Sequence, residues 1–369
     1  MKKILLVTRP IAPPWDEASK NFAYHLAKTL DSFNFSLLTC GTLENLPKHV
    51  KQHPIYTSGK MQMDVFQKAK LLKLLGLKNE FDIIHFMLTP NKINAFCFKT
   101  FLKSKKAKTV QTVATLREDL YSDEDFKKIF FTDAIITYSD YAKSKLLSLG
   151  FQNVTRIYPG IDIENFKYTP KHLATMAMFG INESDFVVTY PGEYTRLGAT
   201  DILMEFIPNL VSQIPNLKFV FACRIKNARD AQKKDDVVLK LQKAGLLDKI
   251  VFTDTFSDMP KIYNLSDIVI FPVNDMAGKF DVPLAVVEAM ACEKPVIISK
   301  IPVLEEFAKG GNSVKIEKGN LKQLEAAILD LRDNLEKRSL LGRNARKYVE
   351  EKFDIKNVAK QYETVYNQI

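Results

Sequence analysis

The sequence predicts an α/β protein made of two successive doubly wound domains. Short apolar runs of strand length alternate with helical stretches along the whole chain, which is typical of parallel sheets covered by helices on both faces. The alternation restarts after a polar, proline-containing stretch at residues 168–184. A chain of 369 residues is also long enough for two cores of roughly 150 residues each.

The first half, residues 1–166, is predicted to be one domain. It opens on MKKILLVT, whose apolar run is too short for a signal peptide and is interpreted as the first buried strand. The predicted strands of this half are Ile4–Thr8, Phe35–Cys40, Phe81–Leu88, Thr109–Val113, Ala134–Tyr138 and Thr155–Tyr158. The predicted helices between them are Ser19–Leu30, Met63–Leu75, Lys92–Leu102 and Tyr141–Leu149.

The second half is predicted as a linker at 167–184, a domain at 185–352 and a returning helix at 353–369. Its strands are expected at Phe186–Tyr190, Leu217–Cys223, Ile250–Thr253, Ile268–Pro272, Pro295–Ser299 and Ser313–Ile316. Its helices are expected at Thr200–Gln213, Lys233–Ala244, Met259–Leu265 and Leu284–Cys292, followed by a helical tail. In that tail, Val358, Tyr362 and Val365 form an apolar face, which we expect to cover the first domain.

Composition and charge narrow the function classes. No apolar run reaches the ~18 residues needed to span a bilayer. The four cysteines are far apart, as in reduced core positions of a cytoplasmic protein. The net charge of +10 lies mostly in residues 1–166, which hold 24 Lys/Arg against 16 Asp/Glu. Lys60–Lys78 and Lys99–Lys108 each carry five lysines, which favours either solvated helix faces or contact with an anionic membrane surface. No motif predicts nucleic-acid binding.

The most informative segment is Asp281–Ser299, DVPLAVVEAMACEKPVIIS. It predicts a helix with Asp281 as its cap and Pro283 in its first turn, followed by a buried strand. Glu288 is the one acidic residue within that apolar helix, and a buried carboxylate needs a hydrogen-bond donor. The two hydroxyls of a ribose would serve, while the helix N-terminus suits a phosphate. Together they indicate a nucleotide.

Other nucleotide and catalytic motifs are missing. The first strand–helix turn, TRPIAPPWDEAS, contains no glycine and so no dinucleotide fingerprint, and GxxxxGK[ST], HExxH and GxSxG are absent. One D-x-D, Asp123–Asp125, is best interpreted as a solvated helix cap.

The second domain opens with YPGEYTRLGA directly after a predicted strand. Gly192 permits a tight turn, and Arg196 lies where an anion could meet its guanidinium. Arg224 follows the next strand. Two arginines at adjacent strand ends, facing a helix N-terminus, would suit a diphosphate; singly, each is more typical of a surface salt bridge.

EAMACEKPVI resembles the central motif of family-4 glycosyltransferases, which are retaining, nucleotide-sugar-dependent enzymes of the GT-B fold. Other landmarks follow in the order of that family: DIIHF, ITYSDYAKSKLLSLG, IYPGIDIENF and LSDIVIFP. The resemblance implies two Rossmann-like domains facing across a cleft. It implies that Glu288 binds the ribose hydroxyls, with Gly192, Arg196, Arg224, Pro283 and Leu284 also on the donor side.

The sequence departs from the family pattern at several points. The first glutamate of the E-x7-E motif falls at Phe280, so Asp281, one residue on, is the candidate for contact with the transferred sugar, unless it only caps the helix. The lysine of the G-R…K-G segment is lost, and so is a first-domain histidine. The glycine pair near residues 13–16 is replaced by PPWDE. There Trp15 lies with Asp16, Glu17 and Lys20 on the expected acceptor side. Trp15 could stack on a sugar while the two acids bind hydroxyls, or it could simply fill a domain interface.

The resemblance implies transfer of a hexose from a nucleotide diphosphate sugar to a hydroxyl of a glycan or lipid-linked acceptor, without bound metal or other cofactor. Asp281 and Asp16 are the candidate catalytic residues. Two alternatives stay open: a catalytically impaired nucleotide- or glycan-binding protein of the same fold, and a sugar-nucleotide epimerase. The expected location is cytoplasmic, with peripheral contact at the inner face of a membrane.

Overall fold

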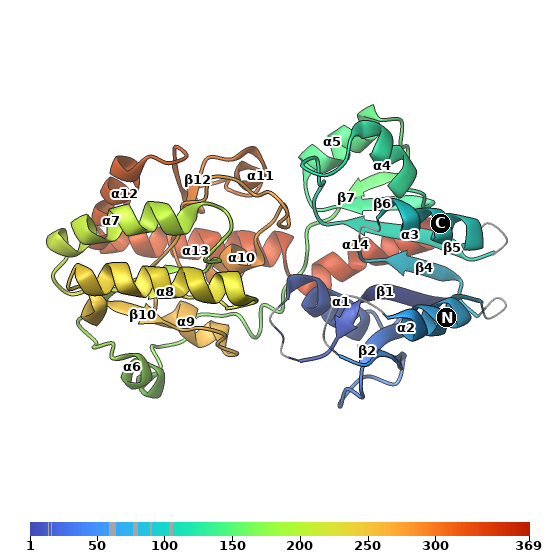
Figure 1. Cartoon of the computed structure of the whole chain (residues 1–369), viewed down its shortest axis with the longest axis horizontal. Helices are drawn as coiled ribbons and strands as arrows, with labels where there is room; N and C mark the ends of the chain where they lie inside the picture. Colours follow the sequence, from blue (N-terminus) through green and yellow to red (C-terminus); the bar gives the residue numbers. More distant parts are fainter. Residues whose placement is uncertain (14, 16, 59–63, 77–79, 89–90, 103–105) are drawn as a thin grey trace. The chain divides into compact units, whose positions relative to one another are not determined.

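The computed structural model describes residues 1–369 except 14, 16, 59–63, 77–79, 89–90 and 103–105 (Figure 1). The chain forms two compact units. The first unit contains Met1–Ile161, Gly278–Val282 and Asp354–Ile369; the second contains Asp162–Ala277 and Pro283–Phe353. Each unit is a parallel sheet with helices, so the predicted fold class, α/β with two doubly wound domains, is confirmed.

The sheet of the first unit has seven strands, and every neighbouring pair is parallel. In spatial order the strands are β3 (Val50–Tyr56), β2 (Asn34–Cys40), β1 (Lys3–Ile11), β4 (Ile83–Phe86), β5 (Lys108–Val113), β6 (Ala134–Thr137) and β7 (Val154–Arg156). The helices of this unit are α1 (Ala18–Thr29), α2 (Val65–Gly76), α3 (Lys92–Leu102), α4 (Asp123–Ile129), α5 (Asp140–Ser148) and α14 (Ile355–Gln368).

The sheet of the second unit has six parallel strands. Their spatial order is β10 (Ile250–Phe252), β9 (Leu217–Phe221), β8 (Phe186–Tyr190), β11 (Ile268–Phe271), β12 (Val296–Ser299) and β13 (Val314–Ile316). Its helices are α6 (Leu173–Phe179), α7 (Ala199–Gln213), α8 (Ala228–Lys243), α9 (Met259–Leu265), α10 (Leu284–Ala291), α11 (Pro302–Glu305), α12 (Leu321–Asp333) and α13 (Leu335–Lys352), with a 3-10 turn at Leu247–Lys249.

Most strands are continuous apolar runs, because helices bury both faces of a parallel sheet. Strands β4, β6, β11 and β12 are buried at every position. The edge strand β3 was not predicted: it is largely polar and contains Pro54, which an edge strand tolerates because its outer backbone groups are unpaired. Within the described residues, no helix combines the length and the apolar character that crossing a bilayer requires.

The compact units differ from the predicted domains at two places. The first stretch of the first unit ends at Ile161, and residues 167–184 belong to the second unit. They include α6, whose buried Met176 packs into a hydrophobic cluster with Val187 and Val220. The sequence hid this helix because it is only seven residues long and has a polar lead-in.

The last helix, α14, belongs to the first unit and is anchored by buried polar groups. Val358, Tyr362 and Val365 are all buried. His85 on β4 is fully buried, with its Nδ1 2.7 Å from the Tyr366 hydroxyl and its Nε2 2.7 Å from Thr112 Oγ1. Burial lowers the pKa of His85 to about 3, so the imidazole is neutral and both its nitrogens are satisfied.

We predict that Tyr366→Phe leaves one buried nitrogen of His85 without a partner and lowers the free energy of unfolding by about 1–3 kcal/mol. Urea denaturation measures this. Tyr168→Phe is the matched control, because Tyr168 is exposed and its loss of a hydroxyl should change little. Equal stability of the two variants would show that the His85–Tyr366 hydrogen bond does not anchor α14.

Candidate functional site

The strand order of the second sheet reverses between β8 and β11. Strands β9 and β10 lie on one side of β8, and β11, β12 and β13 lie on the other. In doubly wound sheets the loops after the two strands at such a reversal diverge and leave a crevice at that edge. The loop after β8 contains Gly192–Gly198, and the loop after β11 leads to α10.

The loop after β8 has a constrained backbone. A Cβ on Gly192 would lie 1.9 Å from the Tyr190 ring, so only glycine fits there. Leu197 and Gly198 have φ of 70° and 68°, and Gly198 begins α7 without a side-chain cap. The Asn274 N–H donates to the Leu197 carbonyl at 2.7 Å, which joins the loops after β8 and β11. The two loops are therefore held together at the predicted ligand edge.

Charged side chains gather on this edge. Glu193, 8% exposed, follows Gly192 directly, and its carboxylate is contacted by the Lys226 ammonium from the loop after β9. Arg196 Nε lies 4.0 Å from the other Glu193 oxygen, and the Arg196 side chain is 58% exposed. Arg224 is partly buried just beyond β9. The predicted donor residues Gly192 and Arg196 thus lie in one loop, with Arg224 on the neighbouring one.

Helix α10 carries the predicted ribose ligand. Pro283 is its N-cap and Leu284 its first residue, so Glu288 lies about 6 Å along the axis from the helix start. Glu288 is partly buried, and its Oε2 accepts a hydrogen bond from the buried Tyr263 hydroxyl on α9 at 3.1 Å. Burial raises the pKa of Glu288 to about 8. The partner is a neutral phenol, and among the described residues Glu288 forms no salt bridge. Either protonation state of its carboxyl can accept a hydrogen bond from a hydroxyl.

Asp281 lies elsewhere, and its predicted role as the cap of α10 is wrong. The segment Gly278–Val282 belongs to the first unit. The Asp281 N–H donates to the Ala114 carbonyl at 2.9 Å, and its carboxylate accepts a hydrogen bond from Ser139 Oγ. The Phe280 ring packs against Tyr138 at 5.5 Å. Asp281 is thus held by a backbone hydrogen bond to Ala114, directly after β5, which helix-capping patterns cannot reveal.

The residues predicted on the acceptor side lie at the start of α1. Trp15 is 42% exposed, with its ring 4.7 Å from that of Tyr24. Glu17 accepts a hydrogen bond from Arg9 at 3.0 Å, and Lys20 is 9% exposed. The predicted Asp16 lies outside the described residues. Trp15 and Glu17 thus share the loop after β1, on the carboxyl edge of the first sheet.

Sequence reasoning missed Tyr263, Asn274, Glu193 and Lys226. Glu193 had a usable signal, since it is an acid directly after Gly192, in the loop that follows a predicted strand. Lys226 could not be identified from the sequence, because its contact with Glu193 joins residues 33 positions apart. Tyr263 is 25 residues from its partner Glu288, so no local pattern links them.

Glu288 should also make stability depend on pH. Its pKa is raised from the ordinary 4.5 to about 8, so the folded state binds a proton that the unfolded state releases. The resulting stabilisation is complete below pH 4.5 and is lost as the pH rises through 8. We predict that Glu288→Gln removes this dependence: its melting temperature relative to wild type should rise between pH 5 and pH 9. Parallel melting curves across that range would contradict the pKa shift.

Comparison with known proteins finds similarity to glycosyltransferases over part of the chain. Residues 174–348 match the family profile described as glycosyl transferases group 1. The chain is similar to the capsular polysaccharide biosynthesis glycosyltransferase CapM of Staphylococcus aureus, with 26% identity over 63% of this chain and 58% of that protein. It is 25% identical to D-inositol 3-phosphate glycosyltransferase of Mycobacterium marinum over 55% of this chain and 43% of that protein.

Solved structures agree on the fold. The structure of Anabaena Alr3699/HepE in complex with UDP and glucose superposes with a TM-score of 0.78 and 16% identity, over all of both chains. Sucrose-phosphate synthase from Thermosynechococcus elongatus gives a TM-score of 0.75 at 16% identity, covering 100% of this chain and 99% of that one.

Proposed function

We propose that this chain, of which residues 174–348 match the profile of glycosyl transferases group 1, transfers a hexose, with retention, from a nucleotide diphosphate sugar to a hydroxyl of a glycan or lipid-linked acceptor. The single observation that carries the proposal is Glu288. A partly buried carboxyl near the start of α10, hydrogen-bonded to a phenol, is suited to a pair of ribose hydroxyls.

The proposed roles follow the geometry of each unit. In the second unit, Glu288 binds the ribose, while Arg196 and Arg224 neutralise the departing diphosphate, with Gly192, Pro283 and Leu284 shaping the site. In the first unit, Trp15, Glu17 and Lys20 contact the acceptor. Asp16 and Asp281 are proposed to contact the reacting sugar.

A panel of sugar nucleotides tests the activity. The protein is incubated with each donor and a mixture of glycan and lipid-linked acceptors, and the released nucleoside diphosphate is measured. We expect release with one donor class, dependent on acceptor and lost in Glu288→Ala. Nucleotide binding without release from any donor would support the impaired binding protein instead. Solvent deuterium entering the donor sugar would support an epimerase.

We also propose that the first unit contacts an anionic membrane surface. Helices α2 and α3 pack on one hydrophobic cluster, yet each leaves large apolar side chains in solvent. Val65 and Phe66 on α2 are 77% and 80% exposed, and Ile93 and Phe96 on α3 are 74% and 71% exposed. Apolar side chains beside lysines are typical of helices that lie in a membrane interface.

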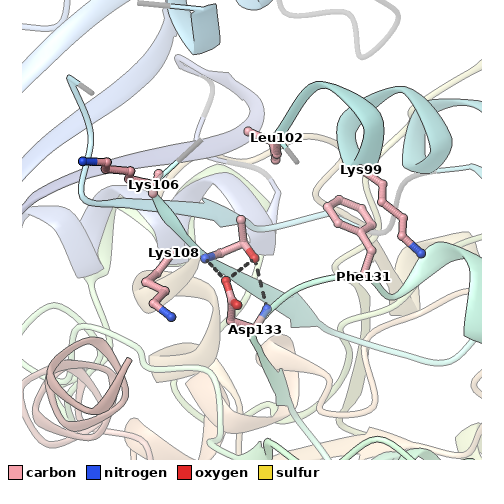
Figure 2. Close-up of a pocket in the computed structure, with 8 residues that line it drawn as sticks. Lys99, Leu102, Lys106, Lys108, Phe131 and Asp133 are labelled. Carbon is pink, nitrogen blue, oxygen red and sulfur yellow. Dashed lines mark hydrogen bonds between the residues drawn. The ribbon is translucent and has the colours of Figure 1, made fainter. Parts of the chain in front are cut away.

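A hollow of about 420 Å³ lies beside α3, at the amino ends of β5 and β6. Lys99, Lys106 and Lys108 line it, and none of the three has an ion-pair partner among the described residues. Asp133 in the hollow accepts hydrogen bonds from the Thr109 N–H and hydroxyl at 2.7 and 2.8 Å. Figure 2 shows the three ammonium groups pointing in different directions, which suits a diffuse anionic surface better than one bound phosphate.

Sedimentation with vesicles tests the membrane proposal. Binding should require anionic lipid and weaken as the salt concentration rises. It should also be weaker in the double variant Lys99→Glu/Lys108→Glu, because each lysine contributes about 1 kcal/mol to the binding free energy. Lys322→Glu on the second unit is the control. Equal binding to neutral vesicles would contradict the electrostatic argument.

We further propose a cytoplasmic location, to which the free thiols of Cys40, Cys97, Cys223 and Cys292 are suited.

A further inference from the structure

We infer that Lys226 is a ligand of the donor diphosphate and takes the place of the lysine that the loop after β8 lacks. The inference rests on the proposed function and adds to it a residue from a different loop. The first observation behind it is that the Glu193 carboxylate is nearly buried at the predicted ligand edge of the second sheet.

The backbone of Glu193 is fixed on both sides. Its N–H donates to the Tyr190 hydroxyl at 3.4 Å, and its carbonyl accepts a hydrogen bond from Thr200 Oγ1 at 3.2 Å. Its side chain therefore projects from a defined point directly after Gly192. An almost buried carboxylate is costly unless cations compensate it, and here two cations do so.

Those cations come from two loops. Lys226 and Arg196 both face Glu193, so two cations meet one carboxylate there. The side chain of Lys226 is 29% exposed and that of Arg196 is 58% exposed. An ammonium has three donors, so Lys226 can hold Glu193 with one and offer the others to a phosphate.

The neighbouring contacts also hold Lys226 in place. The Lys226 N–H donates to Asp230 Oδ2 at 3.2 Å, and Thr195 Oγ1 donates to Asp230 Oδ1 at 2.6 Å. One carboxylate thus ties the start of α8 to the loop after β8. Lys226 is consequently presented beside Arg196, where two cations can share a diphosphate.

The test compares Lys226→Met, which removes the ammonium, with Glu193→Gln, which breaks the same ion pair but keeps the ammonium. Binding of UDP, GDP and free uridine is measured by calorimetry, starting with the wild type. Lys226→Met should weaken binding of the preferred diphosphate roughly ten- to a hundredfold and leave uridine within about twofold. Glu193→Gln should keep diphosphate affinity within about threefold, and Lys226→Arg should recover most of it.

The outcomes separate this inference from the proposed function. If the wild type binds neither diphosphate, the proposed function and the inference both fail. If the wild type binds one and Lys226→Met binds it equally well, only the inference fails, and Lys226 is a structural partner of Glu193. Equal losses in Lys226→Met and Glu193→Gln would likewise overturn it, because the ion pair and not the ammonium would then matter. The salt dependence of diphosphate binding should be smaller in Lys226→Met than in the wild type.

Discussion

Glu288→Ala is expected to reduce nucleotide affinity by roughly a hundredfold or more, because it removes the proposed acceptor for two ribose hydroxyls. Thermal stabilisation by UDP or GDP should disappear, and so should diphosphate release from the active donor. The protein itself should remain folded, since Glu288 is replaced within a short apolar helix where alanine is favourable.

Tyr263→Phe is the matched control for this experiment. It removes the hydrogen bond between Tyr263 and Glu288 without touching the carboxyl. Nucleotide stabilisation should survive in Tyr263→Phe and vanish in Glu288→Ala. If nucleotide instead stabilises both variants equally, Glu288 serves only to bind Tyr263.

Arg346→Ala is expected to have the largest effect on stability. Nη1 of Arg346 lies 3.2, 2.8 and 2.9 Å from the carbonyl oxygens of Ile163, Phe166 and Ala291, and its Nε donates to Glu350 at 2.6 Å. Ala291 is the last residue of α10, so one guanidinium ties the end of that helix to the chain entering the second unit. We expect a loss of about 3 kcal/mol, since hydrogen bonds to charged groups contribute about 1.5–3 kcal/mol each.

Urea denaturation of three variants measures this effect. Arg346→Lys should recover only part of the loss, because a single ammonium cannot reproduce the planar fork. Arg343→Ala, an exposed position on the same helix, should change stability by less than about 0.5 kcal/mol. A similarly small change in Arg346→Ala would show that water replaces the guanidinium at these carbonyls.

Much of the fold could be predicted because it depends on local pattern. Helix α3 has the predicted bounds, and α9 and β8 do as well. Helix α8 begins five residues earlier than predicted, at Ala228 instead of Lys233, because Asn227 caps it by accepting from the Arg229 and Asp230 N–H groups. Its first turn contains charged residues, so a prediction based on apolar periodicity alone placed the start of the helix too late.

The site was predictable only in part. Glu288 could be identified because a lone acid in an apolar helix violates the local pattern. Asp281 could not be placed, since its position follows from the Ala114 carbonyl and Ser139, both distant in sequence. The same holds for Lys226, whose partner Glu193 lies in another loop. Contacts between loops depend on sheet order, which the alternation of strands and helices does not specify.

A crystal structure of the protein with UDP or GDP bound tests the central claim most directly. We predict that the ribose hydroxyls lie at about 3 Å from the Glu288 carboxyl, close to the start of α10. A nucleotide whose ribose points away, with Glu288 still bonded to Tyr263 alone, would contradict the assignment of this carboxyl and of the donor site built around it.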